Sequence, residues 1–346
     1  MTVDRAPVPP RVVPSAGLVE SVVAAFSLPR PVHWLDLGGL WTTNLRFDYA
    51  DGSAVVARAH RGLTPPERLL AIQSAKDAAR RFRLPVPAAI PAPDGRGWST
   101  LPDGTLVEVE EHIDWDTPMR TFAFLHKGFA ALARLHDALR TLQTATPVAS
   151  PPHATYLDPG QVVDGVCRGA SRMRAWGEPR FSALADDVQR HCEAIADKEE
   201  RLRHDQVRQL VHGDFWDDNV VFRGLQLAGV LDFDFLGERD RIEELALTLW
   251  FYLLEPGNNP PGDVQVQQVR GLVNTYDQSS ALSLSDAERE RLPLALARQP
   301  AWIAGGWLPA LADAGARAQA ADLAARLPTA EAILDDLTTW TSALAR

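Results

Sequence analysis

The residues with the clearest chemical potential in this chain are acidic and amide side chains in one short stretch. An apolar, strand-like segment leads into His212-Gly213-Asp214, and Asn219 follows Asp214 by five positions. A second strand-like segment precedes Asp232 and Asp234, and Asp232 lies thirteen positions after Asn219. Kinase catalytic loops place an aspartate that orients a hydroxyl, and an asparagine and an aspartate that bind Mg²⁺, at such intervals. The spacing therefore predicts phosphoryl transfer to a hydroxyl group.

Phosphoryl transfer assigns different roles to these side chains. We predict Asp214 as the catalytic group, because a carboxylate that binds no metal can orient the hydroxyl and take up its proton. Asn219 and Asp232 are the predicted Mg²⁺ ligands, since amide and carboxylate oxygens suit this hard cation. Asp234 is a further candidate ligand, and the alternative for it is a side chain that faces solvent.

The same stretch resembles a known family of small-molecule kinases. His-Gly-Asp in place of the His-Arg-Asp of protein kinases, with Asn219 at the same offset, is similar to the aminoglycoside phosphotransferase and choline-kinase-like group. Residues 132–136 upstream and residues 237–246 downstream add to the resemblance, although Glu244 stands where the family more often has aspartate. The resemblance extends over approximately residues 33–250 and implies a transferase that phosphorylates an alcohol.

The family resemblance also implies an α+β, protein-kinase-like fold with two lobes. Residues 1–112 are expected to form a nucleotide-binding lobe from a small five-stranded antiparallel sheet and a helix, and residues 113–346 a larger, mostly helical catalytic and substrate-binding lobe. The segment pattern agrees, since Asp51-Gly52 and Asp103-Gly104 mark hairpin turns between alternating apolar segments. In this family the histidine corresponding to His212 supports the loop through hydrogen bonds, and we expect the same here.

A glycine-bearing turn between the first two strand-like segments is the candidate phosphate-binding element. It contains Gly38 and Gly39, and Thr42 and Thr43 follow. Backbone N–H groups in such a turn, together with threonine hydroxyls, can bind phosphate oxygens. The position ahead of a three-strand meander distinguishes this turn from an ordinary pair of glycines.

The second hairpin of the first lobe ends in the expected hinge, at Glu111 and Ile113. Here the backbone rather than the side chains would hydrogen-bond a purine base, so residue identity does not distinguish ATP from GTP. We predict ATP as the nucleotide, with GTP as an alternative, and Mg²⁺ as the metal.

Kinases hold the phosphates with a cation on the third strand, and this chain has an arginine there. Its three lysines all lie outside the first-lobe strands, whereas Arg58 lies in the third one. A guanidinium can bind phosphate oxygens bidentately, and the resembling family also uses arginine at this position. The alternative is an arginine that faces solvent.

The helix after the third strand has no glutamate where kinases place the partner of that cation. Thr64 at the N-cap, Pro65 at N1 and Glu67 at N3 predict a capping box at the start of this helix, and the box occupies the helix's only glutamate. Gln73 is nearest to the family's glutamate position. It can hydrogen-bond Arg58 but cannot balance the charge of that guanidinium, so the sequence leaves open what does.

Composition and charge limit the class of protein. The 346 residues are 46% hydrophobic and 23% charged, as is ordinary for a globular protein. The first 113 residues carry 12 basic and 12 acidic side chains, so the whole net charge of −10 resides in the remainder. This argues against nucleic acid as the main partner and is compatible with a cationic substrate near the second lobe.

Other features indicate a cytoplasmic setting without membrane attachment. Cys167 and Cys192 match no metal or redox spacing, and residues 1–14 lack the apolar core of a signal peptide. The longest apolar run, residues 245–254, is about half the length of a membrane span and is typical of a buried helix. We expect a monomer or a homodimer.

Trp216 and Asp217, within the catalytic loop, are the candidate contacts to the acceptor. Further candidates are two tryptophans and four acidic residues, namely Trp176, Trp302, Asp158, Asp164, Glu178 and Glu255. The first expectation for the acceptor is an aminoglycoside-like or other antibiotic, as in resistance or self-protection. The alternatives are a metabolic choline-, homoserine- or sugar-like alcohol, and a pseudokinase scaffold that binds a nucleotide without transfer. A metallophosphoesterase would need additional histidine ligands at strand ends.

Overall fold

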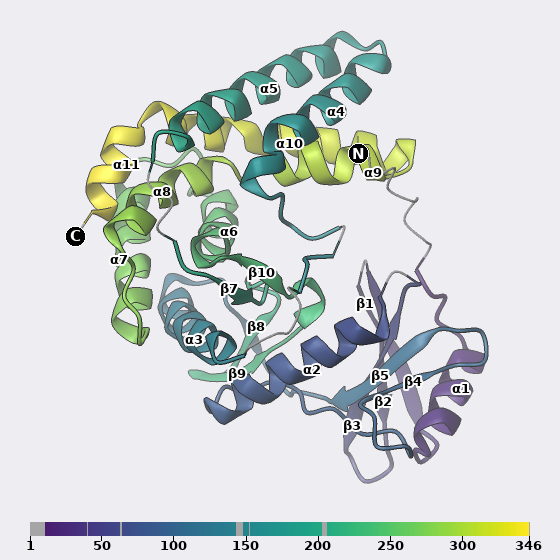
Figure 1. Cartoon of the computed structure of the whole chain (residues 1–346). Helices are drawn as coiled ribbons and strands as arrows, with labels where there is room; N and C mark the ends of the chain where they lie inside the picture. The colour runs from purple at the N-terminus through teal and green to yellow at the C-terminus, as the bar shows by residue number, and fades with distance from the viewer. Residues whose placement is uncertain are drawn as a thin grey trace. The chain divides into compact units, whose positions relative to one another are not determined.

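A computed structural model describes residues 11–39, 41–62, 64–142, 148–151, 153–202 and 206–345. The chain divides into two compact units, shown in Figure 1. The small unit falls within Val8–Thr117 and Phe222–Leu231, and the large unit comprises most of Pro118–Val221 and Asp232–Arg346. The lobe boundary at residues 112 and 113 stays a prediction.

The small unit contains one antiparallel sheet of five strands, as the sequence predicts. Its strands are β1 (His33–Gly38), β2 (Thr42–Asp48), β3 (Ala54–His60), β4 (Trp98–Thr100) and β5 (Leu106–Glu111). They are paired in the order β1-β2-β3-β5-β4. The predicted hairpin turn between β2 and β3 has Gly52 at a φ of +85°, a conformation that glycine adopts without strain.

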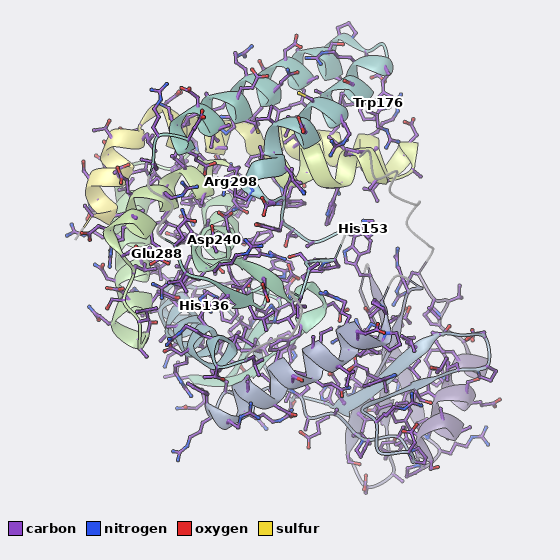
Figure 2. All side chains as sticks on the ribbon, viewed as in Figure 1. His136, His153, Trp176, Asp240, Glu288 and Arg298 are labelled. Carbon is purple, nitrogen blue, oxygen red and sulfur yellow. The ribbon has the colours of Figure 1, made fainter. Side chains whose placement is uncertain are left out.

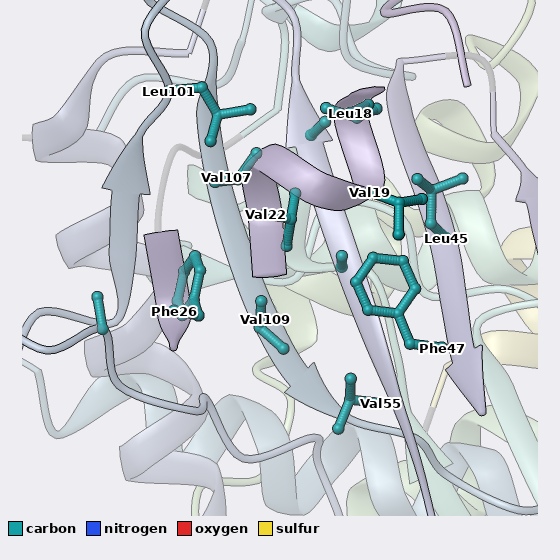
Figure 3. Close-up of a cluster of buried hydrophobic side chains, with 13 residues drawn as sticks. Leu18, Val19, Val22, Phe26, Leu45, Phe47, Val55, Leu101, Val107 and Val109 are labelled. Carbon is teal, nitrogen blue, oxygen red and sulfur yellow. The ribbon is translucent and has the colours of Figure 1, made fainter. Parts of the chain in front are cut away.

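The two faces of this sheet differ in polarity. Helix α1 (Ala16–Phe26) packs its apolar side against one face, where the two elements form a hydrophobic core (Figure 3). Its labelled members are Leu18, Val19, Val22, Phe26, Leu45, Phe47, Val55, Leu101, Val107 and Val109. Successive side chains of a strand point to opposite faces, so the intervening residues form the other face. That face is polar, and side chains of helix α2 (Pro66–Arg81) contact it.

The predicted capping box of α2 is wrong. The helix begins at Pro66, and Pro65 is its N-cap, in an extended conformation with φ −77° and ψ 155°. A residue that precedes proline is disfavoured in the helical conformation, so Pro65 stays extended and Thr64 lies one residue outside the cap. Glu67 is therefore one residue too early for the reciprocal bond, but it remains in the first turn, where the helix dipole favours an acid.

The large unit is mostly helical, as predicted. Its helices are α3 (Phe122–Arg140), α4 (Val162–Ala175), α5 (Pro179–Glu199), α6 (Arg241–Leu254), α7 (Asp263–Ser279), α8 (Asp286–Ala297), α9 (Leu308–Ala310), α10 (Asp313–Asp335) and α11 (Leu337–Leu344). Short turns of 3₁₀-helix at Pro159–Gln161 and Phe233–Phe235 and a π-helix at Trp302–Trp307 complete it. Helix α8 begins with a capping box of Ser285 and Glu288. None of the helices in the described ranges is long and apolar enough to cross a membrane.

Short strands hold the catalytic loop at both ends. β7 (Arg208–Val211) pairs with β10 (Gly237–Asp240) and ends immediately before His212. β8 (Val220–Arg223) begins immediately after Asn219, in a sheet of the order β6-β8-β9 with β6 (Thr117–Pro118) and β9 (Gln226–Val230). The loop of residues 212–219 is thus fixed by strand pairing on either side.

Candidate active site

Asp214 and Asn219 are joined directly across the catalytic loop. The Asn219 amide Nδ2 donates to the Asp214 carboxylate at 2.8 Å and to the Asp214 backbone carbonyl at 2.9 Å. Because an amide has its donor and its acceptor on opposite atoms, Oδ1 of Asn219 is the atom left for a cation. The hydroxyl of Thr155, from the segment before α4, donates to the Gly213 carbonyl at 3.1 Å and lies 3.4 Å from the Asp214 carboxylate.

The environment of Asp214 favours its protonated form. Burial of the carboxyl group, and then the negative charge of Asp232, raise the pKa of Asp214 to about 8. The hydrogen bond from Asn219 and the positive charge of Arg239 act in the opposite direction. The repulsion shows that the structure brings the carboxylates of Asp214 and Asp232 into one electrostatic neighbourhood, although eighteen positions separate them in the sequence.

Asp232 occupies an unusual backbone position. It has φ 56° and ψ 74°, a left-handed conformation that a non-glycine residue adopts rarely and that occurs often at functional sites. Its carboxylate accepts the backbone N–H of Asp234 at 3.3 Å, which keeps the two predicted ligands within one turn. The oxygens of Asn219, Asp232 and Asp234 suit Mg²⁺ chemically. In the described ranges, no group of three or more His, Cys, Asp or Glu side chains forms a metal site of its own.

The start of the catalytic loop is held from α6 by Glu244. This fully buried carboxylate accepts the backbone N–H groups of His212, at 3.0 Å, and of Gly213. It also accepts from Nε2 of His136 at 2.8 Å. Burial acts to raise the pKa of Glu244, but the hydrogen bond and charge of His136 and the nearby positive groups outweigh it and hold that pKa low. His136 is thus a buried core residue that is hydrogen-bonded at both ring nitrogens.

His212 is enclosed by the loop that it precedes. Its Nδ1 accepts the backbone N–H of Asp214 at 3.2 Å, and its ring packs against Phe233 with 4.4 Å between ring centroids. The side chain is fully buried. These contacts fit a supporting role for His212.

Sequence reasoning missed Arg239, although it lies in one of the segments that carry the family resemblance. Its guanidinium donates to the carbonyls of Phe235, at 3.0 Å, and of Gly213, at 3.4 Å, and it lies 4.4 Å above the Tyr156 ring. Arg239 is 1% exposed. Gly213 has φ +87°, and a Cβ there would clash with the Phe235 carbonyl. The glycine thus lets the Asp214 and Asp232 segments approach, and Arg239 joins them.

The predicted acceptor contacts lie beside a small cavity. Trp216 packs against Phe251 of α6, with 4.9 Å between ring centroids. The Asp217 carboxylate forms an ion pair with Arg120 at 2.6 Å. Arg120 also forms an ion pair with Asp218, at 2.9 Å. The cavity, of about 20 Å³, is lined by Met119, Arg120, Leu125, Trp216, Asp217, Thr248, Phe251, Tyr252 and Glu255.

A second cavity, of about 10 Å³, lies on the side of Thr155. Arg298, Gln299 and Trp302 form part of its wall, and Oε1 of Gln299 and Nε1 of Trp302 are buried there without hydrogen-bond partners. Trp176, by contrast, donates to Asp313 at 2.8 Å, and Figure 2 shows it well away from His136.

The remaining acidic candidates have local roles. Asp158 caps a 3₁₀ turn by accepting the N–H of Gly160 at 3.0 Å, and Glu178 pairs with Arg180 and Arg317. Asp164 is exposed in the first turn of α4, and Glu255 is exposed at the first cavity. These contacts do not bring the four residues together around a common ligand.

The candidate phosphate turn of the small unit is conformationally demanding. Gly38 and Gly39 have φ +87° and +109°, and a Cβ at Gly39 would lie 2.5 Å from the Thr42 carbonyl oxygen. Thr43 is fully buried and its hydroxyl donates to the Val12 carbonyl at 2.6 Å, so this hydroxyl is already occupied. Thr42 is also buried. The backbone N–H of Gly38 donates to the Asp36 carboxylate at 2.9 Å, so this donor is occupied as well.

The structure limits the prediction for the hinge and supports the one for Arg58, the cation of the third strand. The N–H of Glu111 donates to the Ala88 carbonyl at 2.9 Å, so this donor is not available to a purine, and Ile113 follows outside the strand. Arg58 is 2% exposed, which excludes the alternative of a solvent-facing arginine. Its Nε donates to Oδ1 of Asn44 at 3.2 Å.

Known proteins resemble this chain in sequence over part of its length. A homoserine kinase of Phenylobacterium zucineum (strain HLK1) is 30% identical over 128 residues, which are 35% of this chain and 38% of that protein. A homoserine kinase of Rhodopseudomonas palustris (strain BisB5) is 36% identical over 85 residues, 25% of this chain and 24% of that protein. The chain thus matches well under two thirds of each relative.

Solved structures resemble nearly the whole chain in fold. A microcompartment-associated aminopropanol kinase has a TM-score of 0.67 at 16% identity, over 96% of this chain and 99% of that one. An amicoumacin kinase in complex with AMP-PNP and Ca²⁺ has a TM-score of 0.66 at 15% identity, over 91% and 94%. An aminoglycoside phosphotransferase of Alicyclobacillus acidocaldarius has 0.65 at 14% identity, over 99% of both chains. The predicted protein-kinase-like fold is confirmed.

The family is established by a match that covers most of the chain. Residues 35–279 match the family model described as the phosphotransferase enzyme family. This range contains Asp214, Asn219 and Asp232 as well as Arg58 of the small unit. The resemblance seen in the catalytic-loop motif is thereby confirmed, and the chain belongs to the phosphotransferase enzyme family.

Proposed function

We propose that this protein transfers a phosphoryl group from a nucleoside triphosphate to the hydroxyl of a small, amine-bearing alcohol. The observation that carries the proposal is the joined pair of Asp214 and Asn219, with the Asp232 charge acting on Asp214. A phosphotransferase needs one carboxylate for the hydroxyl and oxygen ligands for Mg²⁺ close by, and this loop supplies both.

Each side chain of the site has a distinct task in this mechanism. Asp214 accepts a hydrogen bond from the acceptor hydroxyl, orients its oxygen towards the γ-phosphorus and takes up the proton as transfer proceeds. Oδ1 of Asn219 and the carboxylates of Asp232 and Asp234 would hold Mg²⁺, which supplies charge neutralisation for the phosphates when bound. Glu244 and Arg239 keep the loop in place through the contacts described above.

The small unit would hold the nucleotide. The glycine turn of Gly38 and Gly39, through the backbone N–H of Gly39, and the guanidinium of Arg58 would bind phosphate oxygens, and the hinge near Ile113 would bind the base. ATP is the first nucleotide to test, and GTP is the alternative. A nucleotide analogue bound to one structural relative supports this assignment.

The acceptor class follows from what the relatives share. Homoserine, aminopropanol and aminoglycosides, named in the matched proteins, are all alcohols that carry an amine. The excess of acidic residues after position 113 suits such a cation. The sequence matches are to homoserine kinases, whereas the antibiotic-modifying relatives are similar in fold, so a small amino alcohol is the first candidate. An amine-bearing antibiotic is the second, favoured by the same acidic excess.

Phosphate transfer from Mg·ATP or Mg·GTP to a panel of acceptors tests this proposal. The panel contains homoserine, aminopropanol, choline, aminoglycosides and amicoumacin, and mass spectrometry detects each phosphorylated product. Transfer to homoserine or aminopropanol supports the first candidate, and transfer to antibiotics alone supports the second. Nucleotide binding without transfer to any alcohol would identify a scaffold and overturn the proposal.

Asp214→Asn and Asp218→Asn form the matched pair of variants for this screen. Both replace one carboxyl group of the same loop by an amide, but the Asp218 side chain is 50% exposed and pairs with Arg120. We expect product formation to be lost with the first variant and retained with the second.

A further inference from the structure

A cluster of charged side chains is buried on the polar face of the small unit's sheet. Arg58 and His60 of β3 are each 2% exposed, Glu108 of β5 is 1% exposed and Glu110 is 7% exposed. Burying such groups is costly unless each finds an opposite charge or a hydrogen-bond partner. The pairing within this cluster therefore determines what each side chain can do.

Glu108 is the centre of the cluster. The strand register places it directly opposite Arg58. Its Oε2 accepts from Nε2 of His60 at 2.8 Å, and its Oε1 accepts from Nε2 of Gln73 at 3.1 Å. A carboxylate that receives hydrogen bonds on both oxygens from two different elements has a fixed orientation.

Glu108 is ionised in spite of its burial. Burial acts to raise its pKa, but the hydrogen bond from His60 and the positive charges of Lys76, His60 and Arg58 outweigh it and lower the pKa to about 2. The charge of Arg58 thus has a permanent negative neighbour on the adjacent strand.

Arg58 also connects Glu108 with the glycine turn. Its Nε donates to Oδ1 of Asn44 at 3.2 Å, and Nδ2 of Asn44 donates to the Gly38 carbonyl at 3.2 Å. A Cβ at Gly39 would lie 2.8 Å from the same Asn44 amide nitrogen. The arginine therefore lies between an anchoring acid on one side and the candidate phosphate turn on the other.

Helix α2 contributes donors and a cation to this face. Its Gln73 donates to Glu108, and its Lys76 pairs with Glu110 at 2.5 Å. In protein kinases the charges are arranged the other way round, with a strand lysine and a helix glutamate. In this chain the acidic side chain opposite the strand cation, Glu108, lies on the sheet instead of on the helix.

We propose that Glu108 is the positioning residue for Arg58, and that it replaces the helix glutamate of other kinases in orienting the phosphate-binding cation. The inference rests on the proposed function, because it takes Arg58 as a phosphate ligand. It also assigns Gln73 a role, since the Gln73 amide fixes the Glu108 carboxylate and so links α2 to the cation without an ion pair.

The test is equilibrium binding of AMP-PNP with Mg²⁺, and of adenosine, to the purified full chain. For Glu108→Gln we expect the dissociation constant of AMP-PNP to rise about tenfold or more, because the negative charge directly opposite the cation on the adjacent strand is lost. The constant for adenosine, which has no phosphate, should stay within about twofold. If the role of Glu108 were merely structural, its replacement would weaken the binding of both ligands together.

Glu110→Gln is the matched control. It makes the same chemical change two positions along the same strand and on the same face, but its partner is Lys76 rather than Arg58. Its AMP-PNP constant should stay within about threefold of the wild-type value. An equal loss in both variants would overturn the proposal.

Moving the charge back to the helix gives a second, independent test. The double variant Gln73→Glu/Glu108→Gln keeps one carboxylate in the same place, because the two side chains are in hydrogen-bond contact. This double variant tests the proposal even if the single variant Glu108→Gln does not fold. Recovery of AMP-PNP affinity to within about threefold of wild type supports the proposal, and a loss of tenfold or more contradicts it.

Different binding results would overturn the proposed function and the role of Glu108. A wild-type chain that binds neither ATP nor GTP would overturn the proposed function. A wild-type chain that binds nucleotide, with a folded Glu108→Gln variant that binds AMP-PNP equally well, would overturn only the role of Glu108.

Discussion

Glu108 in the small unit and Asp214 in the large unit are both enclosed carboxyl groups, yet their pKa values move in opposite directions. Burial opposes ionisation in both. Around Glu108 the chain places Arg58, His60 and Lys76, and the pKa falls to about 2. Beside Asp214 the strongest charge is the negative one of Asp232, and the pKa rises to about 8.

The difference lies in the neighbouring charges rather than in the depth of burial. The negative charge of Glu108 is balanced by cations of the protein itself, which suits a permanent structural anchor. Asp214 and Asp232 repel each other, and a divalent cation bound by Asp232 would relieve that repulsion. A carboxyl group whose ionisation depends on what binds nearby suits a reaction in which a proton is taken up.

The largest expected effect is on the Asp214 side of this comparison. Asp214→Asn should lower kcat by about 10²- to 10⁴-fold, because the variant cannot accept the hydroxyl proton. The dissociation constant of AMP-PNP should change little. Steady-state kinetics and calorimetric titration measure the two quantities, and Asp218→Asn controls for the loss of one carboxyl group from the loop. A parental kcat in Asp214→Asn would remove Asp214 from the mechanism.

The next largest effect is expected at Glu244, a third buried carboxylate. Glu244 resembles Glu108 in its environment, because His136 donates to its carboxylate and the pKa of Glu244 is lowered. Glu244→Leu should lower the free energy of unfolding by about 3–5 kcal/mol, since it leaves Nε2 of His136 and two backbone N–H groups unpaired. Urea unfolding measures the change. Glu193→Gln on the exposed side of α5 should cost under about 0.5 kcal/mol. Equal costs for both variants would contradict the anchoring role of Glu244.

Acid should weaken the Glu108 contribution in a defined pH range. Its pKa is about 2 in the folded chain and about 4.5 when unfolded, so the unfolded chain binds the proton first as the pH falls. The contribution is therefore fully present above about pH 5 and is lost as the pH approaches 2. From the pKa difference, wild type should exceed Glu108→Gln by up to about 3 kcal/mol near neutral pH. Unfolding free energies measured between pH 3 and 7 that differ by a constant amount would rule out this ionisation.

Local patterns in the sequence were sufficient for the catalytic loop and for much of the fold. The spacing of Asp214, Asn219 and Asp232 is short-range, and strand pairing on both sides keeps those residues together. The apolar run of residues 245–254 predicted a buried helix, and it lies within α6. Thr64 failed as a cap because two consecutive prolines delay the start of α2, a local effect that the capping pattern alone does not include.

Interactions between distant segments could not be predicted in the same way. The alternation Val107-Glu108-Val109-Glu110 is typical of a strand with one solvated face, so nothing local showed that α2 covers the two glutamates. One signal was present in the sequence. Arg58 and His60 alternate on β3 with the same period as the two acids on β5, which indicates complementary faces once the strands pair. The contacts of Arg239 and Thr155 with the catalytic loop had no comparable signal.

The smallest effect tests whether an external cation acts on the large-unit carboxylates alone. Without nucleotide, Mg²⁺ at about ten times its dissociation constant should stabilise the wild-type chain by about 1 kcal/mol, because it binds the folded site and relieves the repulsion between Asp214 and Asp232. Asp232→Asn should abolish this response, measured as the shift of the thermal unfolding midpoint. Glu108→Gln should keep the response, since Glu108 already has its cations within the chain. A response that persists in Asp232→Asn but disappears in Glu108→Gln would reverse the assignment of the two carboxylates.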